Sequence, residues 1–466
     1  MVGKNFVHPY IPNSEPTVKK EMLDFLGMES SEDIYKEIPD KLRFKGEMNL
    51  PEPILSEARL QRHVEELLDK NRNAKNTLCF LGGGTWNHYV PAVCDTIAAR
   101  DEFLTAYVGE TYSDHGKWQA LFETASMIGE LTGFNAAGNP TYDWANAVAI
   151  TCRMACRTAG KQEVLLPKNM SPSRMMVVKN YMKPEIAIKE VAFDERTGRL
   201  DIADLKGKLT DKTAVVYFEN PNYIGAIETE AREIIQASKD AGALVIAGVD
   251  PSTLGVLEAP GEMGADYAVG DYQPLGLHMG FGGSLSGFIC TKDEEKFVAE
   301  YPLLLFGLTD TIGEGEYGFG EVFFERTSYA SREKGKDFIG TTTALHGIVA
   351  GVYMALMGPQ GFYELGRGIM QRSAYAKKKL AGINGVNIPL EGVSYCDFIV
   401  NFDKTGKTVK EINSALLQRD IFGGKDVSEE FPVLGQSALY SITEMHSKED
   451  IDRLVSAIKA VCGESK

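Results

Sequence analysis

The chain has 466 residues, of which 44% are hydrophobic and 24% are charged. These proportions are typical of a globular protein and exclude a wholly disordered chain, and the length predicts two or three domains. Asp and Glu outnumber Lys and Arg by 65 to 49, giving a net charge of −16. This balance argues against nucleic-acid binding, because phosphate contacts need a basic face.

Residues 1–75 predict an N-terminal arm. EMLDFLGM and ILSEARLQRHVEELLDKN have the apolar spacing of amphipathic helices. The segment between them contains several prolines and is expected to be extended. We expect an arm of this kind to wrap a neighbouring chain or to pack over the main domain.

Residues 76–335 predict a large α/β domain. Two helices come first: one has an apolar face and ends at Gly133, and the other is capped by Asp143 and ends near Gly160. Apolar strands then alternate with helices, and the strands are EVLLP, IAIKEVAF, TAVVYFEN, ALVIAGVD, DYAVGD and SGFICT. This alternation is typical of a mostly parallel sheet covered on both faces.

Residues 336–466 predict a long helix followed by a small α+β domain. The apolar stretch 344–357 is too short to span a membrane and predicts a buried helix. Strands are expected at VNIPL, FIVNF and ALYSITEM, with a helix at VKEINSALLQRD. The last helix is expected to start at Ser447, with Asp450 completing a capping box.

The sequence lacks the features that are typical of several classes of protein. No apolar run is long enough for a transmembrane helix, and no signal peptide is visible. The seven cysteines are scattered, with only Cys152 and Cys156 close together, so we expect reduced thiols in a cytoplasmic protein that is not bound to a membrane. HExxH, clustered His/Cys pairs and GxSxG are absent, so neither a metal site nor a hydrolase triad is expected.

The most informative local motif is ALVIAGVDPSTLGVL, in which an apolar strand ends at Asp250. Ligands of open α/β sheets bind beyond the carboxyl ends of the strands, so Asp250 is well placed to face one. In pyridoxal-phosphate enzymes a carboxylate at such a position keeps the pyridine nitrogen protonated. A cap or turn role is the alternative, and turn statistics favour it.

A lysine is missing where a pyridoxal enzyme of this layout needs one. Between Lys239 and Lys292 the sequence has no Lys or Arg, and Gln273 and Pro274 stand where an amine is wanted. Since Gln cannot form an imine, we expect that this chain does not hold the cofactor on its own lysine.

Three loops are candidates for ligand contacts. The glycine-rich segments FLGGGTWNHYVP and GFGGSLSGF allow close backbone approach to an anion, or form tight turns, and neither matches a P-loop or a dinucleotide fingerprint. Asn220, Asn222 and Tyr223 follow a strand and face a ligand crevice, or build a turn, which turn statistics favour. His88 and His115 are the histidines nearest these loops, although a lone histidine is more often structural.

Taken together, these stretches resemble the N-terminal half of the glycine cleavage system P-protein in its two-subunit form. The resemblance covers nearly the whole chain, and its most diagnostic stretch is VDPSTLGVLEAPGEMGADYAVGDYQPLGLHMGFGG. Further matching segments are HPYIPNSEP, NHYVPAV, QALFETASMIGELTGF, REKGKDFIGTTTALHGIVAGVYMALMGPQGFYEL and TEMHSKEDIDRLVSAI.

The resemblance implies a fold-type I, transferase-like pyridoxal-phosphate architecture. It implies that a homologous subunit 2 carries the Schiff-base lysine and the pyridoxal phosphate, so the absent lysine is expected. It also implies decarboxylation of glycine, with transfer of the aminomethyl group to the lipoyl arm of the H-protein.

The sequence departs from the family pattern at 107–116, 138–142 and 332–345, loops that we expect to border the substrate site. Two alternatives therefore stay open: a paralogous complex acting on another amino acid or amine, and a non-catalytic scaffold. By position in these loops or in the matching stretches, the expected cofactor-binding residues are Asn87, Asp143 and Asp250, and the expected catalytic residues are His88, Tyr107, Tyr112 and His115. Packing of these residues at a subunit interface is the alternative.

Overall fold

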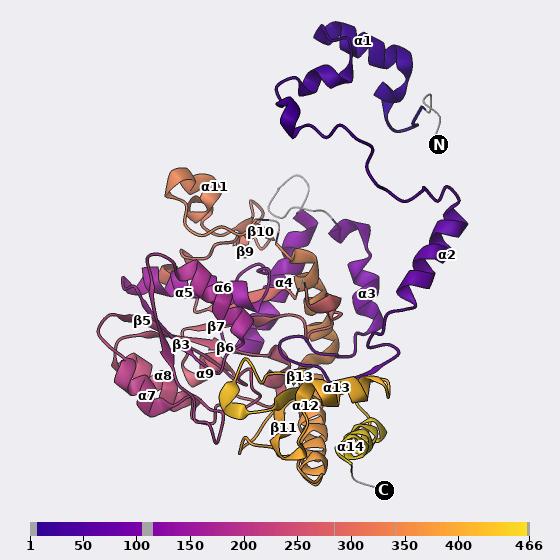
Figure 1. The fold of residues 1–466 in the computed structure, drawn as a ribbon. Coiled ribbons are helices and arrows are strands. Elements are labelled where there is room, and N and C mark those ends of the chain that lie inside the picture. The colour runs from indigo at the N-terminus through magenta and orange to yellow at the C-terminus, as the bar shows by residue number, and fades with distance from the viewer. Residues whose placement is uncertain (1–6, 105–114, 284, 341, 464–466) are drawn as a thin grey trace. The chain divides into compact units, whose positions relative to one another are not determined.

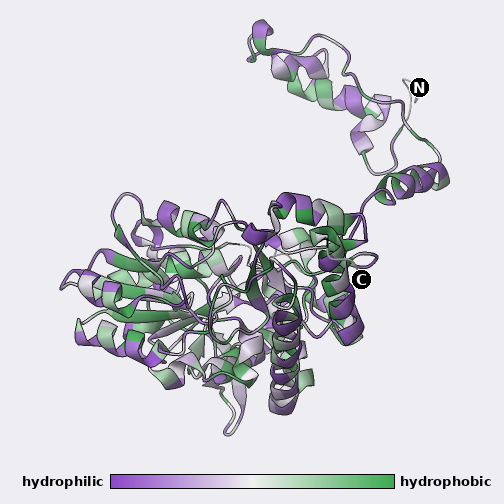
Figure 2. Cartoon of the chain, turned by 60° about the horizontal axis from the view of Figure 1, so that its bottom comes forward, coloured by the Kyte–Doolittle hydropathy of each residue, from purple (hydrophilic) through white to green (hydrophobic). Residues whose placement is uncertain are grey.

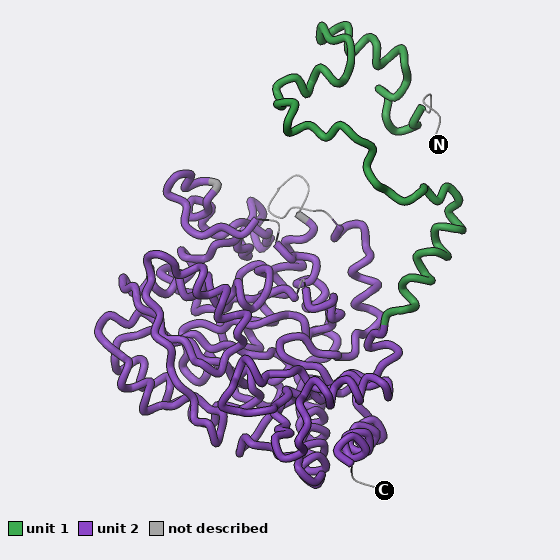
Figure 3. Tube along the Cα trace, viewed as in Figure 1, with its two compact units in different colours: residues 1–71 green, residues 72–466 purple. Residues whose placement is uncertain are grey.

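The structure is a computed structural model that describes residues 7–104, 115–283, 285–340 and 342–463. The chain divides into two compact units, residues 1–71 and residues 72–466 (Figure 3).

The first unit contains two α-helices, α1 (Pro16–Leu26) and α2 (Glu57–Leu68). The carboxylate of Glu15 caps α1 by accepting a hydrogen bond from the N–H of Val18, and the helix ends at Gly27 in the left-handed conformation. No side chain of the described residues 7–71 is buried. This unit therefore has no hydrophobic core of its own.

A seven-stranded sheet forms the centre of the second unit (Figure 1). The strand order is β2-β8-β7-β6-β5-β3-β4; β3 to β7 are parallel, and β8 is antiparallel to both of its neighbours. The strands are β2 (Ala136–Ala137), β3 (Glu163–Pro167), β4 (Ala187–Val191), β5 (Thr213–Glu219), β6 (Leu244–Gly248), β7 (Tyr267–Asp271) and β8 (Gly287–Thr291).

Successive residues of a strand point to opposite faces of the sheet. Both faces of this sheet therefore carry apolar side chains, and helices cover both. Val164 and Leu166 pack into one apolar cluster and Leu165 into another. The inner strands β3 and β5 are accordingly buried along their whole length, and Figure 2 shows the sheet as mostly hydrophobic. On the first face lie α5 (Trp144–Ala159), α6 (Pro172–Met182) and α10 (Glu295–Val298); on the second lie α3 (Ala92–Ala98), α4 (His115–Thr132), α7 (Ile202–Lys208), α8 (Ala231–Asp240) and α9 (Pro260–Met263). A hairpin, β9 (Phe306–Asp310) and β10 (Tyr317–Glu321), and the short α11 (Ser328–Ser331) follow.

The long helix α12 (Ala344–Leu380) joins the sheet domain to the C-terminal region. It is kinked at Gly358, with φ 56° and ψ 178°, immediately before Pro359, which cannot continue the backbone hydrogen-bond ladder. Ala350 lies in the apolar cluster on the second face of the large sheet, whereas Ala376 lies in the core of the C-terminal region.

The C-terminal region is built on a three-stranded antiparallel sheet of order β11-β14-β13. Its elements are β11 (Asp397–Asn401), α13 (Val409–Leu417), β12 (Ile421–Phe422), β13 (Lys425–Asp426), β14 (Ser437–Ser441) and α14 (Lys448–Cys462). β12 pairs in parallel with β1 (Leu78–Cys79) from the beginning of the second unit. A segment that precedes the large sheet in sequence is thereby fixed to the C-terminal region.

The predicted α/β class is confirmed, and the six predicted strands recur as β3 to β8 within two residues of their expected bounds. The caps expected at Asp143 and Ser447 are also present. The strand expected at VNIPL is wrong: only Asn387 forms a bridge, to Asn401, and Pro389 has no N–H to extend the pairing. The predicted domain boundaries stay predictions.

Candidate active site

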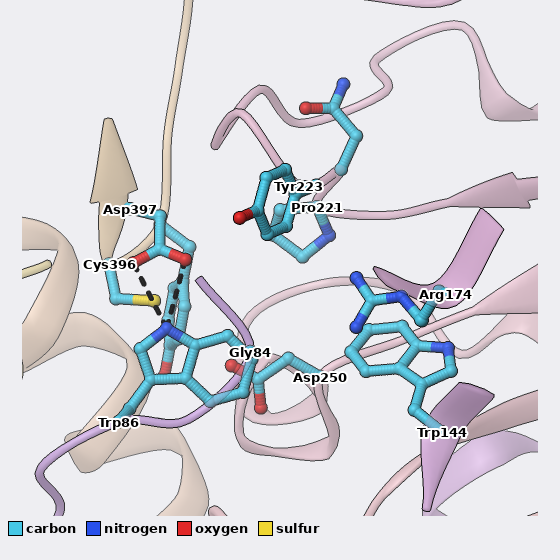
Figure 4. A pocket seen from close by; sticks show the side chains of 11 residues that line it. Gly84, Trp86, Trp144, Arg174, Pro221, Tyr223, Asp250, Cys396 and Asp397 are labelled. Carbon is cyan, nitrogen blue, oxygen red and sulfur yellow. Dashed lines mark hydrogen bonds between the residues drawn. The ribbon is translucent and has the colours of Figure 1, made fainter. Parts of the chain in front are cut away.

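A small pocket lies where the carboxyl ends of β5 and β6 meet the C-terminal region (Figure 4). This is the edge at which open α/β sheets bind their ligands. Its lining residues are Gly84, Trp86, Trp144, Arg174, Pro221, Asn222, Tyr223, Asp250, Tyr395, Cys396 and Asp397.

Asp250 follows β6 and provides a carboxylate to this pocket. Its Oδ1 accepts hydrogen bonds from the backbone N–H and the hydroxyl of Ser252, at 2.9 and 2.8 Å, so it also caps the short 3₁₀ turn that follows. Its Oδ2 is buried and has no hydrogen-bond partner among the described residues. Burial raises the pKa of Asp250, and His88 opposes that shift. The two roles considered from the sequence, cap and ligand-facing acid, are therefore compatible.

Arg174 reaches the pocket from α6 and forms a two-bond ion pair with Glu219 at the end of β5. Its Nε and Nη2 donate to the two carboxylate oxygens at 2.9 and 3.0 Å. The guanidinium carbon lies 4.1 Å from the centre of the Trp144 ring, a cation–π contact visible at the right of Figure 4. Tyr217 completes the network, because its hydroxyl donates to Glu219 and accepts from the indole N–H of Trp144. Burial alone would lower the pKa of Arg174, but Glu219 raises it, so the guanidinium stays charged.

Trp86 lies on the opposite wall, at the end of the first glycine-rich loop. Its indole N–H donates to both carboxylate oxygens of Asp397, at 3.1 and 3.0 Å. Its backbone N–H donates to Oε1 of Gln273 at 3.1 Å, and its carbonyl oxygen accepts from Nε2 of Gln273 at 3.0 Å. Burial raises the pKa of Asp397 to about 6, and the bond from Trp86 opposes the shift. The residue at the expected lysine position thus holds the loop that covers the pocket.

His88 forms a buried pair with Glu444 beside the pocket. Its Nδ1 lies 2.9 Å from Oε2 of Glu444, and its Nε2 is buried without a partner among the described residues. Burial alone would lower the pKa of His88, but Glu444, Asp250 and Asp397 together raise it. The pKa of Glu444 is lowered, because the attraction of His88 and the bonds to the carboxylate outweigh burial. The His88 imidazole therefore stands among three carboxyl groups that favour its charged form.

The residues expected from the sequence are distributed unevenly over this site. Asp250 lines the pocket, and His88 interacts electrostatically with the Asp250 carboxylate. The carbonyl oxygen of Asn87 accepts a hydrogen bond from the hydroxyl of Thr443 at 2.6 Å. Asp143 caps α5 by accepting from the N–H of Asn146. Tyr107 and Tyr112 lie outside the described residues; His115 begins α4, and its side chain lies outside them as well. The functional roles of all seven expected residues stay predictions.

Sequence reasoning did not single out Trp86, Trp144, Arg174, Asp397 and Glu444. Two of them have a local signal: Trp86 lies within the glycine-rich segment FLGGGTWNHYVP, and Trp144 directly follows Asp143. A tryptophan beside a polar turn is a frequent ligand wall. Arg174 is a lone arginine in the largely apolar SPSRMMVVKNYM. Nothing local distinguishes Asp397 or Glu444 from ordinary surface acids.

The N-terminus of α5 and Gln273 bear on whether this chain holds the pyridoxal phosphate that the resemblance implies. A phosphate group favours a helix N-terminus, because the first N–H groups of a helix are free to bind it. At α5 those groups are used by acids: the N–H of Trp144 donates to Asp271 at 2.6 Å, and that of Asn146 to Asp143 at 2.7 Å. With Gln273 at the lysine position, the residues present do not fit a covalently held pyridoxal phosphate.

Other kinds of site are not found in the part of the chain that the structure describes. No group of three or more His, Cys, Asp or Glu side chains there is arranged to hold a metal ion. No helix among those residues is long and apolar enough to cross a membrane.

The strand order, the helices on both faces and the ligand edge define the class of protein: the fold is that of the fold-type I pyridoxal-phosphate enzymes. A NifS-like protein matches with a TM-score of 0.61 and 13% identity, over 83% of this chain and 99% of that one. Sphingosine-1-phosphate lyase from Burkholderia pseudomallei matches with a TM-score of 0.64 and 12% identity, over 91% and 94%.

Within that class, the chain belongs to the glycine cleavage system P-protein family, whose model matches residues 8–458. The probable glycine dehydrogenase (decarboxylating) subunit 1 of Staphylothermus marinus is 37% identical over 98% of this chain and 99% of its own length. The protein of that name from Pyrococcus horikoshii is 39% identical over 97% and 99%. A crystal structure of glycine decarboxylase (P-protein) of the glycine cleavage system, in inhibitor-bound form, matches with a TM-score of 0.85 and 32% identity over 98% of this chain and 100% of that one. The resemblance found in the sequence is confirmed.

Proposed function

We propose that this chain is subunit 1 of a glycine decarboxylase of the glycine cleavage system. It acts with a homologous, lysine-bearing subunit 2, and the complex removes the carboxyl group of glycine and passes the aminomethyl group to the lipoyl arm of the H-protein. Similarity over nearly the full length to proteins named probable glycine dehydrogenase (decarboxylating) subunit 1 supports this assignment.

The position of Gln273 is the observation that supports a two-subunit enzyme. Its side-chain amide makes hydrogen bonds to Trp86 and to the carbonyl oxygen of Leu277, so no amine is present at this point of the fold. A pyridoxal enzyme needs that amine to hold its cofactor, and the partner is proposed to supply both the lysine and the pyridoxal phosphate. When bound there, the cofactor supplies the electron sink for loss of the carboxyl group.

The test is reconstitution. The chain, the homologous lysine-bearing chain and lipoyl H-protein are purified separately, and exchange of labelled bicarbonate into glycine is measured for each combination. Activity is expected only when both chains are present. Exchange by the lysine-bearing chain alone at the full rate would contradict the proposal and favour a scaffold or regulatory role. Failure of the two chains to co-elute would contradict the proposal as well.

A second candidate is the same chemistry on another amino acid or amine, in a paralogous complex. Two of the loops that depart from the family pattern contact each other: the Tyr142 hydroxyl donates to the carbonyl oxygen of Gly340, and the Thr343 hydroxyl to that of Thr141, both at 2.7 Å. Because the two loops are in contact, sequence changes in both alter the same surface. A change of substrate requires such a change in the contacts that a surface offers. A panel of amino acids offered to the reconstituted complex separates the two candidates, because only the second predicts faster turnover of a substrate other than glycine.

A further inference from the structure

We propose that the pocket of this chain binds a small amino acid as an intact zwitterion, without covalent attachment. This goes beyond the proposed function, which requires no ligand in the lysine-free subunit. The inference comes from an unpaired acid and an incompletely used base that line the same buried pocket.

Asp250 provides the site for the ammonium group. It is 4% exposed, and its Oδ2 has no hydrogen-bond partner among the described residues, although it lies on a pocket wall. A buried carboxylate oxygen without a donor is unfavourable, and a ligand ammonium group supplies the donor and the opposite charge.

Arg174 provides the site for the carboxylate. Its ion pair with Glu219 uses Nε and Nη2. Its Nη1 is on the side of Gly84, which also lines the pocket: a Cβ built on Gly84 would lie 3.7 Å from Nη1. The guanidinium is fixed against Trp144, so it presents Nη1 without losing side-chain freedom on binding.

The two charges select a zwitterion over a simple ion. Within the described residues no ion pair joins Arg174 to Asp250, so neither charge satisfies the other. A cation alone would leave Nη1 of Arg174 without a ligand, and an anion alone would leave Oδ2 of Asp250 without a donor. The surrounding Trp86, Trp144 and Tyr223 are buried aromatic walls, which exclude water and limit the ligand to a small side chain.

The absence of an amine decides the mode of binding. Gln273 cannot form an imine and is already bonded to Trp86, so the ligand keeps its own amino group free to meet Asp250. The pocket is therefore suited to sensing an amino acid and not to converting it.

The experiment is fluorescence titration of the full chain alone with glycine, methylamine and acetate. Two of the three tryptophans, Trp86 and Trp144, line the pocket, whereas Trp118 packs against Phe306 elsewhere. Glycine should give a saturable change in tryptophan emission that persists in Trp118→Phe, and methylamine and acetate should each bind at least about tenfold more weakly, or about 1.4 kcal/mol.

Two substitutions test the charges and one is the matched control. Asp250→Asn keeps the shape and removes the charge, and Arg174→Lys keeps the ion pair with Glu219 and removes Nη1; each should weaken glycine binding at least about tenfold. Glu163→Gln changes a buried carboxylate in β3 that bonds Thr213, outside the pocket, and should leave the affinity unchanged.

Three results would each overturn the proposal: no saturable change with glycine, an equal response to acetate or methylamine, or an unchanged affinity in both charge variants. The comparison of the three ligands needs no variant, so it decides even where a substitution prevents folding. Since partner and cofactor are absent from the titration, its outcome is independent of whether the reconstituted complex decarboxylates glycine.

Discussion

The side-chain amide of Gln273 bonds both polar groups of the Trp86 backbone, accepting from its N–H at 3.1 Å and donating to its carbonyl oxygen at 3.0 Å. A lysine at this place could not accept the first of these bonds, because an ammonium group has no acceptor. Gln273, which stands where the lysine of a pyridoxal enzyme is expected, thus has a structural role.

Restoring a lysine should therefore not restore cofactor attachment. Gln273→Lys loses the acceptor for Trp86 and places an ammonium group in a buried site, so we expect it to lower the free energy of unfolding by about 2–4 kcal/mol. With added pyridoxal phosphate and borohydride, mass spectrometry should find no pyridoxyl group at position 273, nor on a large-domain lysine of the parent chain. Gln273→Met, which loses the same bonds without adding an amine, is the control for stability.

The pair of His88 and Glu444 should make stability depend on pH in a defined window. The pKa of His88 is raised, so its contribution is complete below its ordinary value of 6.5 and is lost as pH rises through the folded value. The pKa of Glu444 is lowered, so its contribution is present above 4.5 and is lost as pH falls. The loss of stability in Glu444→Gln should be largest between those two values and smaller in alkaline solution.

Urea unfolding at about pH 5.5 and about pH 9 measures this difference, since it brackets the loss of the His88 charge. Glu233→Gln, which breaks the half-exposed pair with Lys206, should show little change at either pH. An equal loss in Glu444→Gln at both values would mean that the charge of His88 does not change between them.

Removal of Arg174 should destabilise the protein severely. Glu219 is fully buried, and Arg174→Met leaves its charge without a partner, which costs about 3–5 kcal/mol in other proteins. Chemical denaturation is the measurement, and changing Arg174 and Glu219 together to apolar residues should recover much of the loss. A loss below about 1 kcal/mol in the single variant would show that the pair behaves as a surface ion pair.

The contribution of Glu228 to stability should change with pH in the direction opposite to that of Glu444. Burial raises its pKa to about 7, against hydrogen bonds from Asn222 and the N–H of Leu200. A raised carboxyl pKa means that stability is highest below 4.5 and falls as pH rises towards 7, by on the order of 3 kcal/mol. Relative to Glu228→Gln, the parent should therefore lose stability between about pH 4.5 and about pH 7.

Glu163→Gln is the matched comparison for Glu228. Lys189 and Thr213 outweigh burial and lower the pKa of Glu163, so its contribution is complete above 4.5 and is lost as pH falls below that value, which is the reverse sign. Denaturation curves should therefore show the loss of stability in Glu163→Gln shrinking as pH falls below about 4.5, whereas the parent loses stability relative to Glu228→Gln as pH rises from about 4.5 to about 7. Changes of the same sign with pH would contradict the assignment.

The sequence allowed the large sheet and the position of Asp250 to be predicted, because both depend on local patterns. Most of the strands are largely apolar runs, and Asp250 follows one of them. The pocket walls could not be predicted in the same way. Trp86 meets Gln273 across 187 residues and Asp397 across 311, and hydrophobic periodicity carries no information on such distant contacts.

The wrong strand at VNIPL has a related cause. Its apolar residues are needed to pack the C-terminal region, where Ile388 lies against the core and Val386 belongs to it. Burial without regular pairing gives the same local composition as a strand, and Pro389 was the residue that favoured the irregular form.

The pairing of β1 with β12 also constrains the order of events during synthesis. The loop that supplies Trp86 and His88 leaves the ribosome early, but Glu444, the partner of His88, is made 356 residues later. At about 5–20 residues per second, roughly 20–70 s pass before the contact with Glu444 can form. Nascent chains therefore carry residues 78–88 without their C-terminal partners for most of translation, which exposes this glycine-rich loop to chaperones and proteases that act on the unfinished protein.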